Sequence, residues 1–190
     1  MKALFVSLIL LGVMSVAKAQ ETPPPPTFSG QTTLCEDSYN GYKLAVPSEF
    51  QGTGKGANAS WEGPKVDNFA TTIFVNCTPM VGVHPQALYD GILRAKKNDR
   101  GVTEVVPIKM TGKLKGKPIY AFRCKEVPIQ VGTGAPKAAD DHHRWFLFVW
   151  GNDCAYELAV CGSYKALGQG QELPPVYDKV IKSFSLIPIK

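Results

Sequence analysis

Apolar and polar residues alternate over several short stretches of this 190-residue chain, which is the pattern of strands with one face in a core. The predicted strands cover residues 42–46, 59–61, 71–77, 103–110, 118–126, 144–150 and 154–161. The last four form two hairpins, one with a turn rich in Lys and Gly and one with the turn Gly151-Asn152-Asp153. Residues 51–58 are rich in glycine and are expected to form a loop.

Two other stretches repeat their apolar residues with the period of a helix. The stripes consist of Leu88, Ile92 and Ala95 in the first stretch and of Leu173, Tyr177, Val180 and Phe184 in the second. Pro85 suits the first turn of a helix, where its missing amide hydrogen has no partner to lose. We therefore expect helices at about residues 85–98 and 174–184.

The predicted strand at residues 144–150 is apolar on both faces. One face carries Trp145, Leu147 and Val149, and the other carries Phe146, Phe148 and Trp150. Such a strand needs a covering layer on each side. The sequence therefore predicts an α+β domain, a three-layer α/β/α sandwich with a mostly antiparallel central sheet. The alternative is a two-sheet β-sandwich, which leaves the two amphipathic helices without a surface to cover.

Residues 1–19 have the features of an export signal, with Lys2, an uncharged apolar run and the small-residue site Ala17-Lys18-Ala19. The apolar run is shorter than the ~20 residues of a membrane-spanning helix. We expect cleavage before Gln20, a Pro-rich tail at residues 20–34 and a single globular domain at residues 35–190. The predicted location is secreted or periplasmic, with no membrane span.

Charge excludes one class of partner. The chain has 21 Lys and Arg residues against 16 Asp and Glu residues, and loss of the leader lowers the net charge from +5 to +3. This weak excess does not resemble the dense positive face of a nucleic-acid binder. The local exception is the lysine turn, defined by Lys109, Lys113, Lys115 and Lys117. Such a turn is either a solvated hairpin tip or a docking patch for an acidic partner or anionic lipid.

The five cysteines are Cys35, Cys77, Cys124, Cys154 and Cys161. Export favours disulfides, and an odd number leaves at least one thiol outside any bond within the chain. Cys154 and Cys161 share one predicted strand, where seven residues span about 23 Å, too far for a disulfide. The other pairings stay open. Because no pair has the CxxC spacing, a thioredoxin-like redox site or a zinc finger is not expected.

Asp140-Asp141-His142-His143 is the sharpest chemical cluster in the sequence. Carboxylate and imidazole ligands together suit Zn²⁺, Mn²⁺ or Cu²⁺. Neighbouring residues of an extended chain point in opposite directions, so one Asp and one His would converge, and a third ligand such as His84 would have to join them. The other interpretation is a charged loop leading into the next strand.

No catalytic constellation is visible. There are three histidines, and Gly162-Ser163-Tyr164 lacks the remaining glycine of a nucleophile elbow. The loop around Lys55 lacks the Ser or Thr that follows the lysine of a phosphate-binding loop. We therefore expect a protein without enzymatic activity and without a cofactor, the divalent metal above excepted.

Three segments resemble the PsbP-like superfamily. They are the opening GYKLAVP at residues 41–47, the glycine turn and alternating strand at residues 111–121, and the closing helix with its exit at residues 177–186. That superfamily includes the PsbP proteins of photosystem II, a nuclear Ran-binding relative and the bacterial DcrB and LpqN groups. The resemblance implies the α/β/α sandwich and a mostly non-catalytic, protein-binding role. The five cysteines and the tetraproline tail depart from its usual pattern.

These observations predict an exported binding or scaffolding protein of the bacterial envelope or extracellular space. It would act through protein–protein contacts, with the lysine turn as the partner surface. The alternative function is a metal-binding accessory protein that uses Asp140, Asp141, His142 and His143.

Overall fold

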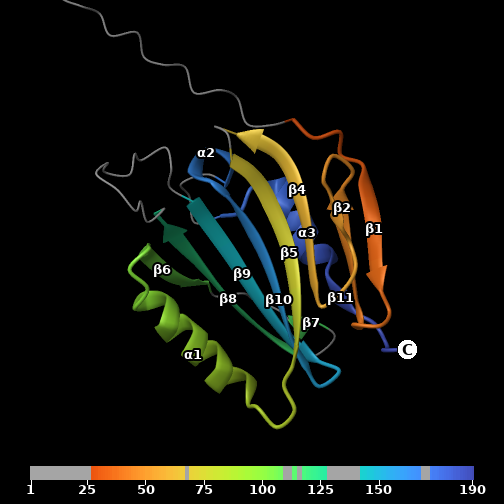
Figure 1. The fold of residues 1–190 in the computed structure, drawn as a ribbon, viewed down its shortest axis with the longest axis vertical. Coiled ribbons are helices and arrows are strands. Elements are labelled where there is room, and N and C mark those ends of the chain that lie inside the picture. Colours follow the sequence, from red (N-terminus) through yellow and green to blue (C-terminus); the bar gives the residue numbers. More distant parts are fainter. Residues whose placement is uncertain (1–26, 67–68, 109–112, 115–116, 128–141, 168–171) are drawn as a thin grey trace, which may run out of the picture.

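The computed structural model describes residues 27–66, 69–108, 113–114, 117–127, 142–167 and 172–190 (Figure 1). Its main sheet consists of β3 (Gln51–Thr53), β4 (Asn58–Val66), β5 (Phe69–Pro79), β6 (Val102–Ile108), β7 (Lys113–Leu114), β8 (Lys117–Glu126), β9 (His142–Gly151) and β10 (Cys154–Ser163). The strands follow the order β3-β4-β5-β10-β9-β8-β6, and β7 pairs with β8 beside this path. Every neighbouring pair is antiparallel.

A second, smaller sheet joins segments far apart in the sequence. It contains β1 (Thr32–Asp37), β2 (Tyr42–Pro47) and β11 (Ser185–Leu186) in the order β1-β2-β11, again antiparallel. Three helices complete the described chain, α1 (Pro85–Lys97), α2 (Tyr164–Leu167) and α3 (Pro175–Ser183). None of the described helices is long and apolar enough to cross a bilayer.

α1 covers one face of the main sheet (Figure 1). Its buried residue Tyr89 packs on the aromatic rings of β8 and β9, with ring centroids 6.2 Å from Phe122 and 6.1 Å from Phe148. The Tyr89 hydroxyl donates a 2.9 Å hydrogen bond to the Ala121 carbonyl. The apolar stripe of the helix therefore lies on the face of β9 that carries Phe146, as its sequence requires.

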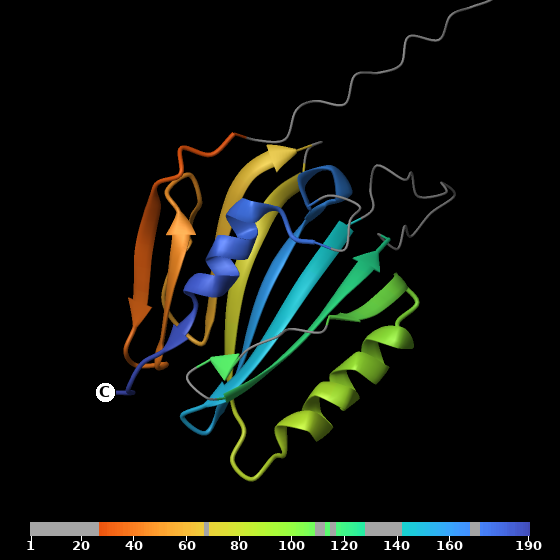
Figure 2. The same cartoon turned by 180° about the vertical axis from the view of Figure 1, so that it is seen from behind.

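The other face of the main sheet is covered by α3 together with the smaller sheet (Figure 2). Tyr177 and Val180 are the buried residues of α3. Tyr42 of β2 stacks on Phe184 with ring centroids 6.1 Å apart, which ties the smaller sheet to the end of α3. These side chains share one core with Leu147 and Val149 of β9.

The predicted α+β class and the mostly antiparallel sheet are confirmed. The three-layer α/β/α sandwich is not confirmed, because the second face carries a three-stranded sheet beside its helix. The hydrophobic pattern of the sequence did not predict this sheet. Only the last of the six β1 residues, Asp37, is buried, so β1 has no alternation of buried and exposed positions to detect.

The chain contributes to the core earlier than residue 35, the predicted start of the domain. The Phe28 ring lies 6.1 Å from Phe50 and 5.8 Å from Tyr177. The predicted export signal at residues 1–19 lies outside the described residues, as do residues 20–26 of the predicted tail.

Candidate binding surfaces

Four connecting segments meet at one end of the main sheet, in both views of the molecule (Figures 1 and 2). They are the β1–β2 turn at residues 38–41, the β5–α1 connection at residues 80–84, the β9–β10 turn at residues 151–153 and the C-terminal residues 187–190. We call this surface the loop end.

Asn152 connects three parts of the loop end. Asn152 and Asp153 have positive φ angles of 52° and 56°, as two-residue turns between antiparallel strands require. The Asn152 side-chain nitrogen lies 3.0 Å from the Ile187 carbonyl, 3.4 Å from the Gly41 carbonyl and 3.2 Å from the Tyr156 hydroxyl. One side chain thus holds the C-terminal segment and the β1–β2 turn against the β9–β10 turn.

Backbone hydrogen bonds of 2.8–3.0 Å complete these connections. The amide of Lys190 donates to Ser38, that of Ile187 to Gly41, and that of Met80 to Asp153. Each of the four segments is therefore bonded to a neighbour, and together they form one continuous surface.

Asp37, the last residue of β1, fixes the β1–β2 turn through its side chain. Its carboxylate accepts hydrogen bonds from the backbone amides of Tyr39, Asn40 and Gly56. Burial alone would raise the pKa of Asp37, but these hydrogen bonds and one from the Asn40 side chain lower it. The charged form of Asp37 is therefore the one that holds the turn.

The loop end carries an unusual share of exposed apolar side chains. Among the described residues, five large apolar side chains are exposed. Four of them lie on the loop end: Tyr39 (79% exposed), Val81 (81%), Val83 (43%) and Ile189 (47%). The fifth, Leu34 (62%), lies on β1. Exposed apolar groups gathered on one surface mark sites of interaction.

The lysine turn is placed only in part. Residues 109–112 and 115–116 lie outside the described residues, so Lys109 and Lys115 are not placed. The backbone of Lys113 and Lys117 starts the β7–β8 pair, and β8 begins beside the end of β9, at the same end of the sheet as the loop end. The lysine turn as a partner surface stays a prediction.

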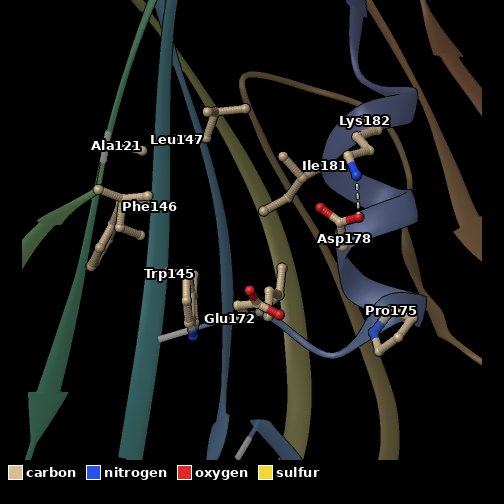
Figure 3. A pocket seen from close by; sticks show the side chains of 11 residues that line it. Ala121, Trp145, Phe146, Leu147, Glu172, Pro175, Asp178, Ile181 and Lys182 are labelled. Carbon is tan, nitrogen blue, oxygen red and sulfur yellow. Dashed lines mark hydrogen bonds and ion pairs between the residues drawn. The ribbon is translucent and has the colours of Figure 1, made fainter. Parts of the chain in front are cut away.

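A cavity lies between α3 and the main sheet (Figure 3). This α3 cavity has a volume of about 420 Å³. Its walls contain Ile108, Ala121, Trp145, Phe146, Leu147, Leu173, Pro175 and Ile181, with Glu172, Asp178 and Lys182 as its charged residues. Figure 3 shows Ile181 pointing from α3 into the cavity, with Trp145 and Leu147 on the opposite wall.

Under α1, on the other face of the sheet, Glu126 pairs with two cations. Its carboxylate oxygens lie 2.9 Å from the Lys96 amine and 2.7 Å from the Arg144 guanidinium. Cys124 and Cys161 stand on either side of Arg144 in the strand register. Burial raises the pKa of Cys124 to about 12 and also raises that of Cys161. Both thiols are therefore protonated near neutral pH and are poor nucleophiles.

The predicted disulfides are unsupported, because all five cysteines are free thiols in the structure. Cys77 and Cys154 come close enough to share a hydrogen bond. Burial is the larger cause and the hydrogen bond with Cys154 is the next, and both raise the pKa of Cys77, to about 12. Burial also raises the pKa of Cys35.

The predicted metal cluster is not assembled within the described residues. Asp140 and Asp141 lie outside them, and for His142 and His143 the structure describes the backbone at the start of β9. In the part of the chain that is described, no group of three or more His, Cys, Asp or Glu side chains is arranged to hold a metal ion. Metal binding by the cluster stays a prediction.

Neither the loop end nor the α3 cavity was predicted from the sequence. The loop end had one local signal, since Met80, Val81 and Val83 place three apolar residues between a strand and a helix, where polar residues are expected. The cavity had none, because its walls come from distant segments that only the fold brings together.

The comparisons with known proteins show the fold. No family model and no curated protein matches the chain. Among solved structures, the Ran-binding protein Mog1p of Saccharomyces cerevisiae matches with a TM-score of 0.54 and 12% identity, over 83% of this chain and 96% of that one. A point mutant of Mog1 matches with a TM-score of 0.53, 12% identity and coverage of 83% and 97%. PA94 of Pseudomonas aeruginosa, a protein of unknown function described as a putative regulator, has a TM-score of 0.44, 13% identity and coverage of 84% and 98%.

Two predictions from the sequence are corrected by these comparisons. The assignment to the PsbP-like superfamily is contradicted, because the structures named above with a TM-score over 0.5 are Mog1 proteins. The secreted or periplasmic location is also contradicted, since the structures named above with a TM-score over 0.5 are those of the Ran-binding protein Mog1p and of a Mog1 mutant.

Proposed function

We propose that this chain is a non-catalytic binding domain that docks a partner protein on its loop end. One observation carries the proposal. Four of the five exposed large apolar side chains in the described residues lie on a single hydrogen-bonded surface. Burying Tyr39, Val81, Val83 and Ile189 against a partner would remove apolar area from water, and this is the main driving force of protein association.

The loop end is also preorganised for binding. The Asn152 side chain, the Asp37 carboxylate and the backbone hydrogen bonds fix its segments to one another. A surface ordered in advance loses little conformational entropy on binding, so more of the contact energy appears as affinity. Loops carried by a rigid sheet are a common place for such sites.

Two further observations support a binding role over catalysis. The Ran-binding protein Mog1p has this fold, so the fold is compatible with a protein partner. The raised pKa values of Cys77 and Cys124 favour protonated thiols, which argues against a cysteine nucleophile.

Charge refines the kind of partner. The backbone of Lys113 and Lys117 lies at the same end of the sheet as the exposed apolar side chains. The lysine turn, predicted from the sequence as a partner surface, favours a partner with an acidic surface beside an apolar one.

The test compares capture of partners by matched variants. The wild-type chain, the triple variant Tyr39→Ser/Val81→Ser/Val83→Ser and the control Leu34→Ser are used as bait in extracts of the source organism, and eluates are quantified by mass spectrometry. Leu34 is the matched control because it is equally apolar and 62% exposed but lies on β1. We expect proteins that the wild type and Leu34→Ser enrich to be lost with the triple variant. Equal enrichment by the wild type and the triple variant would refute the loop end as the docking surface.

A further inference from the structure

The α3 cavity has an apolar interior built from elements of the core. Leu147 and Ala121 come from neighbouring central strands and are 3% and 4% exposed, and Ile181 faces them from α3 (Figure 3). These two strands belong to the same wall of the cavity, which the β8–β9 ladder holds in place. This wall is therefore formed in advance of any ligand.

Its size suits a small molecule. A volume of about 420 Å³ lies within the range of about 300–1,000 Å³ that ligand sites in proteins occupy. Such sites are mostly apolar with a few polar groups that orient the ligand. The α3 cavity has this composition, since three of its lining residues are charged and all the others are apolar or aromatic.

The charged residues of the cavity carry a net negative charge. Asp178 and Lys182, one helical turn apart on α3, form an ion pair and neutralise each other. Glu172 is exposed and forms no salt bridge with another described residue. Trp145 lines the same cavity, and the face of an indole ring attracts cations. The cavity therefore complements a positive charge.

We propose that the α3 cavity binds a small amphipathic cation, a molecule with an apolar body and one ammonium group. The apolar body would contact Leu147 and Ile181, and the ammonium group would lie beside Glu172 and the Trp145 ring. This site is separate from the loop end and goes beyond the docking of a protein. Neutral apolar molecules and anionic amphiphiles are the competing occupants that the test distinguishes.

The test uses two probes of equal chain length, decylammonium and decanoate, below the concentrations at which they form micelles. Binding to the purified full chain is followed by tryptophan fluorescence, to which Trp145 in the cavity wall contributes. We expect decylammonium to bind saturably at one site and about fivefold more tightly than decanoate, the ratio that one solvent-exposed ion pair supplies. Trp145→Phe should abolish the fluorescence response to decylammonium.

Two matched variants test the charge. Glu172→Gln should bring the affinities for the two probes together, whereas Glu36→Gln, which changes an exposed carboxylate on β1, should leave the ratio unchanged. Both changes are on the surface and preserve side-chain size, so the fold is retained. Absence of saturable binding, equal or tighter binding of decanoate, or a response that survives Trp145→Phe would overturn the proposal. Because no partner protein takes part, these results are independent of the capture experiment on the loop end.

Discussion

Replacement of Asn152 by glycine tests the hydrogen bonds that hold the loop end together. Glycine adopts the positive φ of 52° at this position without strain, so Asn152→Gly removes the side chain and keeps the turn. The variant loses the bonds from the side-chain nitrogen to the Ile187 and Gly41 carbonyls. At about 1 kcal/mol for each hydrogen bond, we expect the free energy of unfolding to fall by about 2 kcal/mol. For a chain of this size that corresponds to a fall in Tm of about 4–8 °C.

The assay is urea unfolding together with a thermal melt, and Asp153→Gly is the matched control. Asp153 has nearly the same φ, 56°. In the hydrogen bonds described above it takes part only through its backbone carbonyl, which accepts from the Met80 amide and is kept in the glycine variant. We expect Asp153→Gly to change the free energy of unfolding by less than about 0.5 kcal/mol. Hydrogen exchange at the Ile187 amide should also speed up in Asn152→Gly alone. Equal stability of the two variants would refute the assignment of Asn152 as the connecting residue.

Three further outcomes follow from the described contacts. Tyr89→Phe removes the bond to the Ala121 carbonyl and should lower the free energy of unfolding by about 1–2 kcal/mol in urea denaturation; an unchanged midpoint would contradict this. The hydrogen bonds to Asp37 lower its pKa in the folded state, so their stabilisation is present above about pH 4 and is lost on further acidification; Asp37→Asn should therefore show a shallower loss of stability in acid than the wild type. Changing Lys109, Lys113, Lys115 and Lys117 to Glu should abolish capture of an acidic partner, and undiminished capture would remove the lysine turn from the binding surface.

The sequence predicted the elements whose signals are local. The strand at residues 144–150 has apolar side chains on both faces, and β9 is indeed covered by α1 on one face and by α3 with the smaller sheet on the other. The turn Gly151-Asn152-Asp153 connects β9 and β10 as its residue types indicate, since Asn and Asp tolerate positive φ.

The smaller sheet and the loop end could not be predicted in the same way, because they depend on contacts between distant segments. β11 is two residues long and becomes a strand only by pairing with β2, which lies near the other end of the sequence. The exposure of Tyr39 and Ile189 on one surface follows from that pairing. A pattern of hydrophobic positions records which residues are apolar, but not which apolar residues the fold leaves in water.

Hydrogen exchange of the chain with and without a captured partner tests the central claim most directly. The claim is that a protein docks on the loop end. We expect slower exchange at residues 38–41, 80–84 and 187–190 in the complex, and unchanged exchange in β3 and β4 at the opposite edge of the main sheet from β6. Protection confined to β3, β4 or the exposed side of α1, with the loop end unchanged, would contradict the claim.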